Sequence, residues 1–349
     1  MNVKQVIEQA AAWVEQQGRQ IPGFCGAHLM GSILSMPPDA PFPAHRDVDF
    51  NIVVREETHA TETHDVAYKG LILEYSTVSI ARYRSPGDVL ANPELAANLA
   101  AGGILADPLG ILAPLQRAVA QQYAHPRWVL ARCEYEQRVV MQALEGLRHT
   151  ASPPEAIWLL SSMALFLAGL LAEASLRPPT HRRCLVLLRD VLHAAGRRDL
   201  HEATLQLLGW AHLRRPEVEA YLGDCALAFD RAVAVTRTPV PFQAKLQAHV
   251  RPYIIGGAQE MIDQGYHREA MFWISGFLMF ANSAIQADAP AAEKPYFQAM
   301  LDRLVAEMCL GTPAAIAARA GEAEVLAGAI GAVAGALVEQ RAAGTLLAV

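Results

Sequence analysis

Lysine is scarce in this sequence, and no run of basic residues occurs anywhere in it. Of the 29 lysines and arginines only four are lysines, while 35 acidic residues give a formal net charge of −6. Proteins that bind nucleic acid through its phosphates need a basic patch or stripe. We therefore expect no nucleic acid partner.

The five cysteines are scattered, and no two of them form a CxxC pair. A disulfide framework and a structural zinc site are both disfavoured by this spacing. Residues 1–17 have the pattern of an amphipathic helix and lack the apolar core of a signal peptide. Together these features favour a cytoplasmic protein. The sequence also contains no P-loop, no HExxH and no GxGxxG motif.

Long uncharged segments are few, and two of them approach the length of a membrane span. Residues 156–172 and 270–287 contain no charge, and a spanning helix needs about 18 apolar residues or more. Both segments contain serine and glycine, and neither has a lysine- and arginine-rich flank on one side. We interpret them as buried helices of a helical domain and expect no membrane partner. The spacing Gly331-x-x-x-Gly335 permits close helix packing.

The chain changes character near His125-Pro126, where helix formation is disfavoured. We expect an α+β protein, with a mixed domain at 1–125 (a small mixed sheet flanked by helices) and an all-α domain at 126–349. The predicted strands are Phe24–Leu29, Asp47–Val54 and Leu71–Ile80. The predicted helices are 3–17, 87–101, 111–122, 127–147, 155–175, 181–196, 200–213, 216–235, 242–251, 258–287, 293–308 and 312–341.

The stretch from Asp47 to Val54 is the most informative part of the sequence. Because side chains on a strand alternate between faces, Asp47, Asp49 and Asn51 share one face. The apolar residues between them share the other face, which we expect to be the core face. Two carboxylates on one strand suit a divalent cation such as Mg²⁺, which prefers oxygen ligands. An exposed acidic strand start is the alternative interpretation.

A third carboxylate, Glu74, stands inside the apolar run of the next predicted strand. A charge there is costly unless it is exposed or paired. If the two strands are neighbours, Glu74 completes a three-carboxylate cluster that a cation would stabilise; a paired glutamate on an edge strand is the alternative. Upstream, Gly31 allows the backbone to approach a phosphate, and Ser32 offers a hydroxyl and an N–H group.

This order of Gly-Ser, loop, DxD strand and third acidic strand resembles the DNA polymerase β-like nucleotidyltransferase superfamily. A mixed domain followed by a helical one is most similar to its aminoglycoside adenylyltransferase branch. The resemblance implies transfer of a nucleoside monophosphate, AMP from ATP in particular, to a hydroxyl group, with release of pyrophosphate. It also implies Mg²⁺, with two ions, at Asp47, Asp49 and Glu74, which would be the catalytic residues, with Glu74 completing the metal site or activating the acceptor. Gly31 and Ser32 match the pair that contacts phosphate.

Two features differ from the family pattern. The loop between Ser32 and Asp47 is long and rich in proline. Arg46 precedes the DxD pair, where the family usually has a small hydroxyl residue. We assign Arg46 to the triphosphate, and a surface role is the alternative.

The helical domain offers one candidate patch for the acceptor. Glu260, Asp263 and His267 follow Gly256-Gly257 with spacings of three and four residues, which places them on one face of a single predicted helix. Acids from this domain help to hold a cationic acceptor in the resembled branch. The alternative is that acids in a first helical turn simply stabilise the helix dipole.

The sequence is compatible with several functions. The main hypothesis is an enzyme that nucleotidylates a small molecule, possibly an aminoglycoside-like cation. The alternatives are a protein that modifies a protein or RNA hydroxyl, and a regulatory protein that binds nucleotide or a partner without turnover. The sequence decides neither the acceptor nor whether a homodimer forms.

Overall fold

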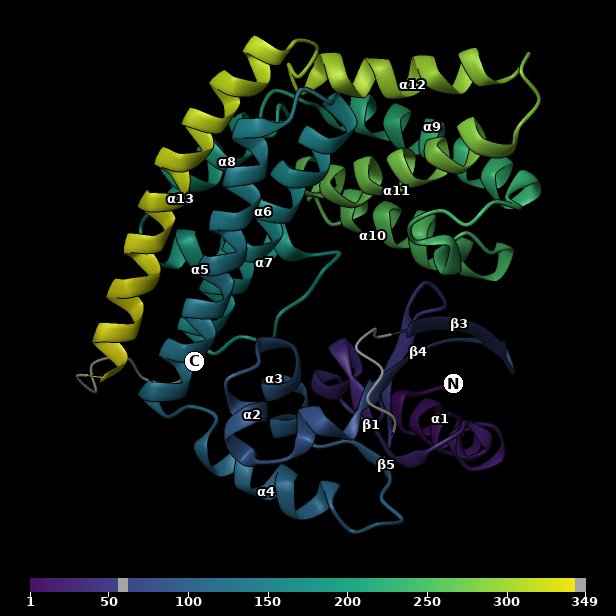
Figure 1. Cartoon of the computed structure of the whole chain (residues 1–349), viewed down its shortest axis with the longest axis vertical. Helices are drawn as coiled ribbons and strands as arrows, with labels where there is room; N and C mark the ends of the chain where they lie inside the picture. Colours follow the sequence, from purple (N-terminus) through teal and green to yellow (C-terminus); the bar gives the residue numbers. More distant parts are fainter. Residues whose placement is uncertain (56–61, 343–349) are drawn as a thin grey trace. The chain divides into compact units, whose positions relative to one another are not determined.

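The computed structural model describes residues 1–55 and 62–342 (Figure 1). By their internal packing the residues form two compact units. The first comprises Met1–Tyr135 with the short segment Leu176–Thr180, and the second comprises Glu136–Ser175 with the chain from His181 onward. The division falls within the helix α5, which begins at Pro126.

The first unit contains a five-stranded mixed sheet in the order β3-β4-β2-β1-β5, counted over the described residues. Strands β2 and β4 are parallel, and the other neighbours are antiparallel. The strands are β1 (Phe24–Met30), β2 (Asp47–Val54), β3 (Glu62–Tyr68), β4 (Leu71–Ser79) and β5 (Ile104–Ala106). The α+β class predicted from the sequence is confirmed.

The two faces of this sheet are covered differently (Figure 1). On one face Val48, Phe50 and Ile52 of β2 pack with α1 (Val3–Gln16), as their alternation predicts. At one end of the opposite face Val53 and Val78 pack with a second core, formed by α2 (Pro86–Leu90), α3 (Pro93–Ala101) and α4 (Leu112–Gln122). The polar residues of β2 lie on this second face.

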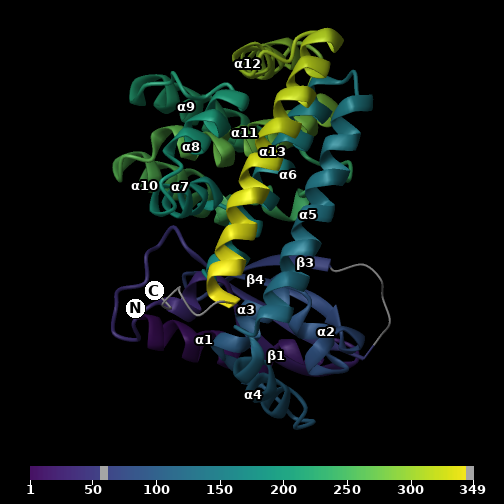
Figure 2. The same cartoon turned by 90° about the vertical axis from the view of Figure 1, so that its left-hand side faces the viewer.

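The second unit is wholly helical over its described residues. Figure 2 shows α13 running alongside α6, and the two helices are in contact. The helices are α5 (Pro126–His149, which begins in the first unit), α6 (Pro153–Ser175), α7 (Cys184–Ala194), α8 (Arg198–Leu207), α9 (Arg215–Val235), α10 (Gly257–Asp263), α11 (His267–Asp288), α12 (Lys294–Glu307) and α13 (Pro313–Ala342).

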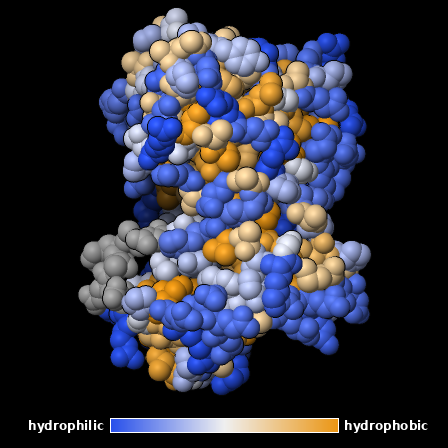
Figure 3. Space-filling model, turned by 90° about the vertical axis from the view of Figure 1, so that its right-hand side faces the viewer, coloured by the Kyte–Doolittle hydropathy of each residue, from blue (hydrophilic) through white to orange (hydrophobic). Residues whose placement is uncertain are grey.

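Three of these helices are long and apolar enough to cross a membrane by length and composition alone: α6, α11 and α13. Of their most apolar windows, 56% is buried in α6 and in α11, and 28% in α13. Burial of more than half of the window in α6 and α11 agrees with their interpretation as core helices. Figure 3 shows apolar patches separated by hydrophilic surface on the face that it draws.

Four predicted helices differ from the structure, and one of them, 200–213, ends early at Leu207. The predicted helix 87–101 is two helices, because Asn92 caps a new helix whose first residue is Pro93. The predicted helix 242–251 consists only of short 3₁₀ turns, and Phe242 there has a positive φ. The predicted helix 258–287 is broken into α10 and α11 at Gly265, whose φ is +86°.

Candidate functional site

Three carboxylates converge on the polar face of the sheet. Asp49 of β2 lies opposite Glu74 of β4 in the parallel register, and Asp47 precedes Asp49 by two residues on the same strand. One oxygen from each of the three residues lies within 4.8 Å of the other two. Asp47 is buried, and the other two are partly exposed. The three acids predicted from the sequence are therefore one cluster that solvent reaches from one side.

Gly31 holds the turn beside these acids. It follows β1 directly with a φ of +71°, and a Cβ atom there would lie 2.4 Å from Asp49 Oδ2. Only glycine fits both this backbone conformation and this close approach. The Gly31 N–H group donates to Asn98 Oδ1 at 2.9 Å. Asn98, on α3, therefore fixes the turn, a role that no sequence pattern indicated.

Ser32 and Arg46 are placed differently from each other. Ser32 is exposed, in a 3₁₀ helix formed by Gly31–Ser35. Because the Gly31 N–H group already has an acceptor, the hydroxyl and N–H groups of Ser32 are the better phosphate donors of the pair. Arg46 lies immediately before β2, and its Nη1 approaches Met36 Sδ at 3.6 Å. The side chain therefore lies partly against the proline-rich loop.

A buried polar network lies on the same face, one step further along β2. The Tyr83 hydroxyl is 2.8 Å from His28 Nε2 and accepts from Asn51 Nδ2 at 3.2 Å. His28 Nδ1 lies 3.0 Å from the Leu29 carbonyl, which can only accept, so Nδ1 carries the proton and Nε2 accepts from Tyr83. Asn51 is two residues from Asp49, so the hydrogen bonds of this network fix the position of the strand that carries Asp47 and Asp49.

Burial sets the protonation of this network. It lowers the pKa of His28 to about 4, and a hydrogen bond to the Leu29 carbonyl opposes that shift only in part. Burial also raises the pKa of Tyr83. Both groups are therefore neutral at pH 7, so the network itself adds no charge beside the acids.

A fourth acid on this face was not predicted from the sequence. Asp65 of β3 lies directly opposite Glu74 in the antiparallel β3–β4 register and is buried. Residues 62–68 were not predicted as a strand, because their run of polar residues lacks a clear apolar alternation. Without that strand, nothing in the sequence placed Asp65 beside the cluster.

The patch predicted in the helical domain is not a single helical face. Asp263 ends α10 and His267 begins α11, so the helical spacing that was expected to align them with Glu260 is wrong. Asp263 accepts from Arg215 Nη2 at 2.7 Å, and Glu260 accepts from Gln264 Nε2 at 3.3 Å. Each acid thus accepts from a nearby side chain; Asp263 is exposed, whereas Glu260 is partly buried.

The donor set of the three-carboxylate cluster fits Mg²⁺. Magnesium takes oxygen ligands at about 2.1 Å, which places adjacent ligands on one ion about 3 Å apart. The ligand oxygens of Asp47, Asp49 and Glu74 lie within 4.8 Å of one another, so they would have to move closer together around a bound ion. The partial exposure of Asp49 and Glu74 leaves room for water and for a phosphate oxygen to complete the octahedron.

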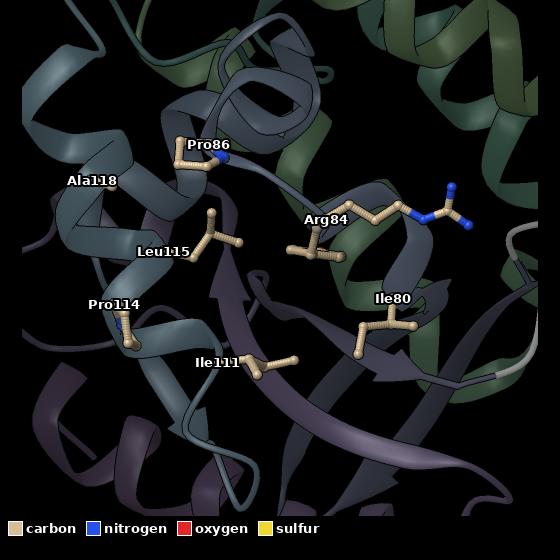
Figure 4. A pocket seen from close by; sticks show the side chains of 8 residues that line it. Ile80, Arg84, Pro86, Ile111, Pro114, Leu115 and Ala118 are labelled. Carbon is tan, nitrogen blue, oxygen red and sulfur yellow. The ribbon is translucent and has the colours of Figure 1, made fainter.

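An open apolar pocket of about 650 Å³ lies elsewhere in the first unit (Figure 4). Ile80, Ile111, Pro114 and Leu115 surround it, and Tyr83 contributes one wall. No carboxylate lines the pocket, so the chemistry of the cluster does not extend into it. The pocket touches the polar network only through Tyr83.

Comparisons with known proteins add little to what the geometry of the site shows. No family model matches the chain, and no curated protein matches it. Among solved structures, it is similar to a nucleotidyltransferase-like protein from Exiguobacterium sibiricum, with 12% identity and a TM-score of 0.29. The match covers 87% of this chain and 92% of that one. At this TM-score the similarity does not establish a common fold.

Proposed function

We propose that the protein is a metal-dependent nucleotidyltransferase, which transfers a nucleoside monophosphate, AMP foremost, from a nucleoside triphosphate to a hydroxyl group of a small molecule. The observation that supports this proposal best is the cluster of Asp47, Asp49 and Glu74, whose ligand oxygens lie within 4.8 Å of one another. Three acids that crowd together on one sheet face repel one another, and a bound cation offsets that repulsion.

The arrangement around the cluster suits a triphosphate. The glycine turn brings Ser32 to the edge of the site, where its hydroxyl and N–H groups serve as phosphate donors. We assign Arg46, the residue before β2, to the same triphosphate, because a guanidinium binds phosphate oxygens in a bidentate manner. The contact between Gly31 and Asp49 fixes the distance between the phosphate turn and the acids.

The proposed reaction is an in-line displacement at phosphorus. The acceptor oxygen attacks the α-phosphorus in line with the bond to the β-phosphate, that bond breaks, and pyrophosphate leaves with its electron pair. Asp47, Asp49 and Glu74 would hold Mg²⁺, which would neutralise charge at the phosphates and lower the pKa of the acceptor hydroxyl. The three carboxylates would hold the ion and orient the reacting groups. The proton of the attacking hydroxyl passes to Glu74 or to solvent.

For the acceptor we propose only a chemical class. The first 125 residues carry 13 acidic and 8 basic residues, so a cationic acceptor would be attracted to this unit. The partners that we propose are thus a nucleoside triphosphate and a small hydroxyl compound that bears positive charge. Glu260, Asp263 and His267 belong to the second unit, and no acceptor contact is assigned to them.

Calorimetric titration tests the triphosphate site. ATP and GTP are titrated with and without Mg²⁺ into the wild type and into an Asp47→Asn/Asp49→Asn variant. We expect binding that depends on Mg²⁺ and that weakens on the order of 100-fold or more in the variant, because both ligands of the ion lose their charge.

The matched control is Asp39→Asn/Asp88→Asn, which makes the same charge change at two exposed acids of the same unit. It should bind like the wild type. If folded wild-type protein binds neither nucleotide, or if the Asp47→Asn/Asp49→Asn variant binds as well as the control, the proposed function is wrong.

A further inference from the structure

A row of uncharged polar residues lies beside the acids, two positions further along β2 and β4. Asn51 of β2 pairs with Ser76 of β4, and Ser76 pairs with Thr63 of β3. Residues directly opposite each other point to the same face of a sheet, and so do residues two positions apart on one strand. These three side chains therefore share the face of the acids, about 7 Å further along the strands.

Two of these three side chains are accessible to a ligand. Asn51 is buried and donates to the Tyr83 hydroxyl, whereas Ser76 and Thr63 are partly exposed. The hydroxyl oxygens of Ser76 and Thr63 lie 2.9 Å apart and share one hydrogen bond, in which either group can donate. A hydroxyl group has one hydrogen and two acceptor lone pairs. This hydroxyl pair thus has a second hydrogen and further lone pairs to offer to a ligand.

The hydroxyl pair and the phosphate turn lie on opposite sides of the acids. Because β1 and β2 are antiparallel, with Met30 opposite Asp49, the turn that follows Met30 lies toward the start of β2. Ser76 lies two residues beyond Glu74, toward the end of β4, which runs parallel to β2. In phosphoryl transfer the attacking and leaving oxygens lie in line, on opposite sides of the phosphorus. With pyrophosphate at Ser32, the acceptor would approach from the side of the hydroxyl pair.

We propose that Ser76 and Thr63 bind the acceptor of the transfer reaction, and that they recognise a second hydroxyl group beside the one that attacks. The inference rests on the proposed function, because it assigns the acceptor to the same sheet face. The hydroxyl pair can both donate to and accept from a ligand hydroxyl. The acceptor class is therefore a compound with at least two hydroxyl groups, such as a sugar ring, whose positive charge the acids attract.

Proton relaxation by bound Mn²⁺ tests the proposal with simple probes. Mn²⁺ and a non-hydrolysable ATP analogue are added to the full chain, followed by glucosamine, a hydroxylated ring with one positive charge. Cyclohexylamine, which has the same ring size and charge but no hydroxyl group, is the comparison. We expect the relaxation enhancement of glucosamine to be at least about 10-fold larger, because a site built for hydroxyl groups discriminates against a ligand that lacks them.

Thr63→Val/Ser76→Ala should remove this preference for glucosamine, since it deletes both hydroxyl groups with little change in shape. Thr77→Val is the matched control, because Thr77 is the next residue on β4 and faces the other side of the sheet. It should keep the wild-type preference. If the double variant keeps the preference too, or if the wild type shows none with Mn²⁺ and nucleotide bound, the inference is wrong and the proposed function stands.

Two further readouts separate the remaining outcomes. A pair of hydroxyl residues across two strands also stabilises a sheet, and that role alone would lower the melting temperature of Thr63→Val/Ser76→Ala while its preference for glucosamine stays intact. The affinity of the double variant for the ATP analogue should equal that of the wild type. Loss of that affinity would place the hydroxyl pair at the nucleotide and overturn the inference. A folded wild type that binds neither Mn²⁺ nor the analogue contradicts the proposed function, and the inference with it.

Discussion

Two groups of carboxylates among the described residues differ in how their charge is balanced. In the first unit Asp47, Asp49 and Glu74 lie on a sheet face that is partly exposed. In the second unit Glu136 of α5 and Glu173 of α6 are both buried. Burial, together with the charge of Glu173, raises the pKa of Glu136 to about 8.

Each cluster also has a glycine pressed against a carboxyl group. A Cβ atom at Gly31 would lie 2.4 Å from Asp49 Oδ2, and one at Gly169 would lie 2.8 Å from the carboxyl carbon of Glu136. The similarity ends there, because Glu136 and Glu173 are both buried, whereas Asp49 and Glu74 are partly exposed. The comparison teaches that solvent access decides how the charge can be balanced: a partly exposed cluster can bind a cation, whereas burial favours the protonated form of a carboxyl group.

Gly31→Ala should have the largest effect on nucleotide binding and on stability. The new methyl group displaces the Asp49 carboxylate, and alanine is strained at a φ of +71°. We expect Mg²⁺-dependent nucleotide binding to weaken at least about 10-fold, and the free energy of unfolding to fall by about 2 kcal/mol. Calorimetry and chemical denaturation measure the two effects.

Gly70→Ala is the matched control for that change. Gly70 has a φ of +81°, and nothing lies within 4 Å of a Cβ atom there. This variant should show the backbone strain alone, with nucleotide binding unchanged. Equal loss of binding in both variants would mean that the contact with Asp49 does not matter.

Glu136→Gln should have the next largest effect, and it depends on pH. Because the pKa of Glu136 is about 8 in the folded chain and near 4.5 in the unfolded chain, the folded state binds more protons between these values. Wild-type stability should therefore fall as the pH rises from 4.5 to 8. The variant, which stays neutral, should be more stable at pH 8 by on the order of 2 kcal/mol.

Urea denaturation at pH 5, 6.5 and 8 measures this difference. Glu134→Gln, a change at an exposed acid two residues earlier on α5, should keep the wild-type dependence on pH. Neither variant should alter the binding of Mg²⁺. A Glu136→Gln protein that loses stability at pH 8 would show that the pair is ionised and held by a cation.

Gly169→Ala should have the smallest effect. Alanine is favoured over glycine within a helix by about 1 kcal/mol, but its methyl group would meet the Glu136 carboxyl group. The net result should be a loss of about 1 kcal/mol. Gly276→Ala, also within a helix, meets nothing within 4 Å and should stabilise the protein instead. Thermal unfolding of both variants decides whether the carboxyl group fills the space beside Gly169.

The sequence predicted the acid cluster because its signals were local. The alternation in β2 separated Asp47 and Asp49 from the apolar face, and the apolar run around Glu74 marked it as an unusual strand residue. The structure confirms both strands and their adjacency. The functional roles of these residues remain predictions.

The parts that the sequence did not predict depend on contacts between distant segments. Asp65 lies in a strand that only its pairing with β4 defines, and Asn98 reaches Gly31 across 67 positions. Gly265, by contrast, is apparent in the sequence. A glycine within a long helical pattern does not by itself indicate a positive φ that ends the helix. The break that it causes separated Asp263 from His267.

A crystal grown with Mn²⁺ and a non-hydrolysable triphosphate analogue tests the central claim most directly. We expect an anomalous difference peak at the manganese edge between the carboxylates of Asp47, Asp49 and Glu74, with the triphosphate beside Ser32. Density for the nucleotide elsewhere, or a bound nucleotide with no metal at these three acids, would contradict the account.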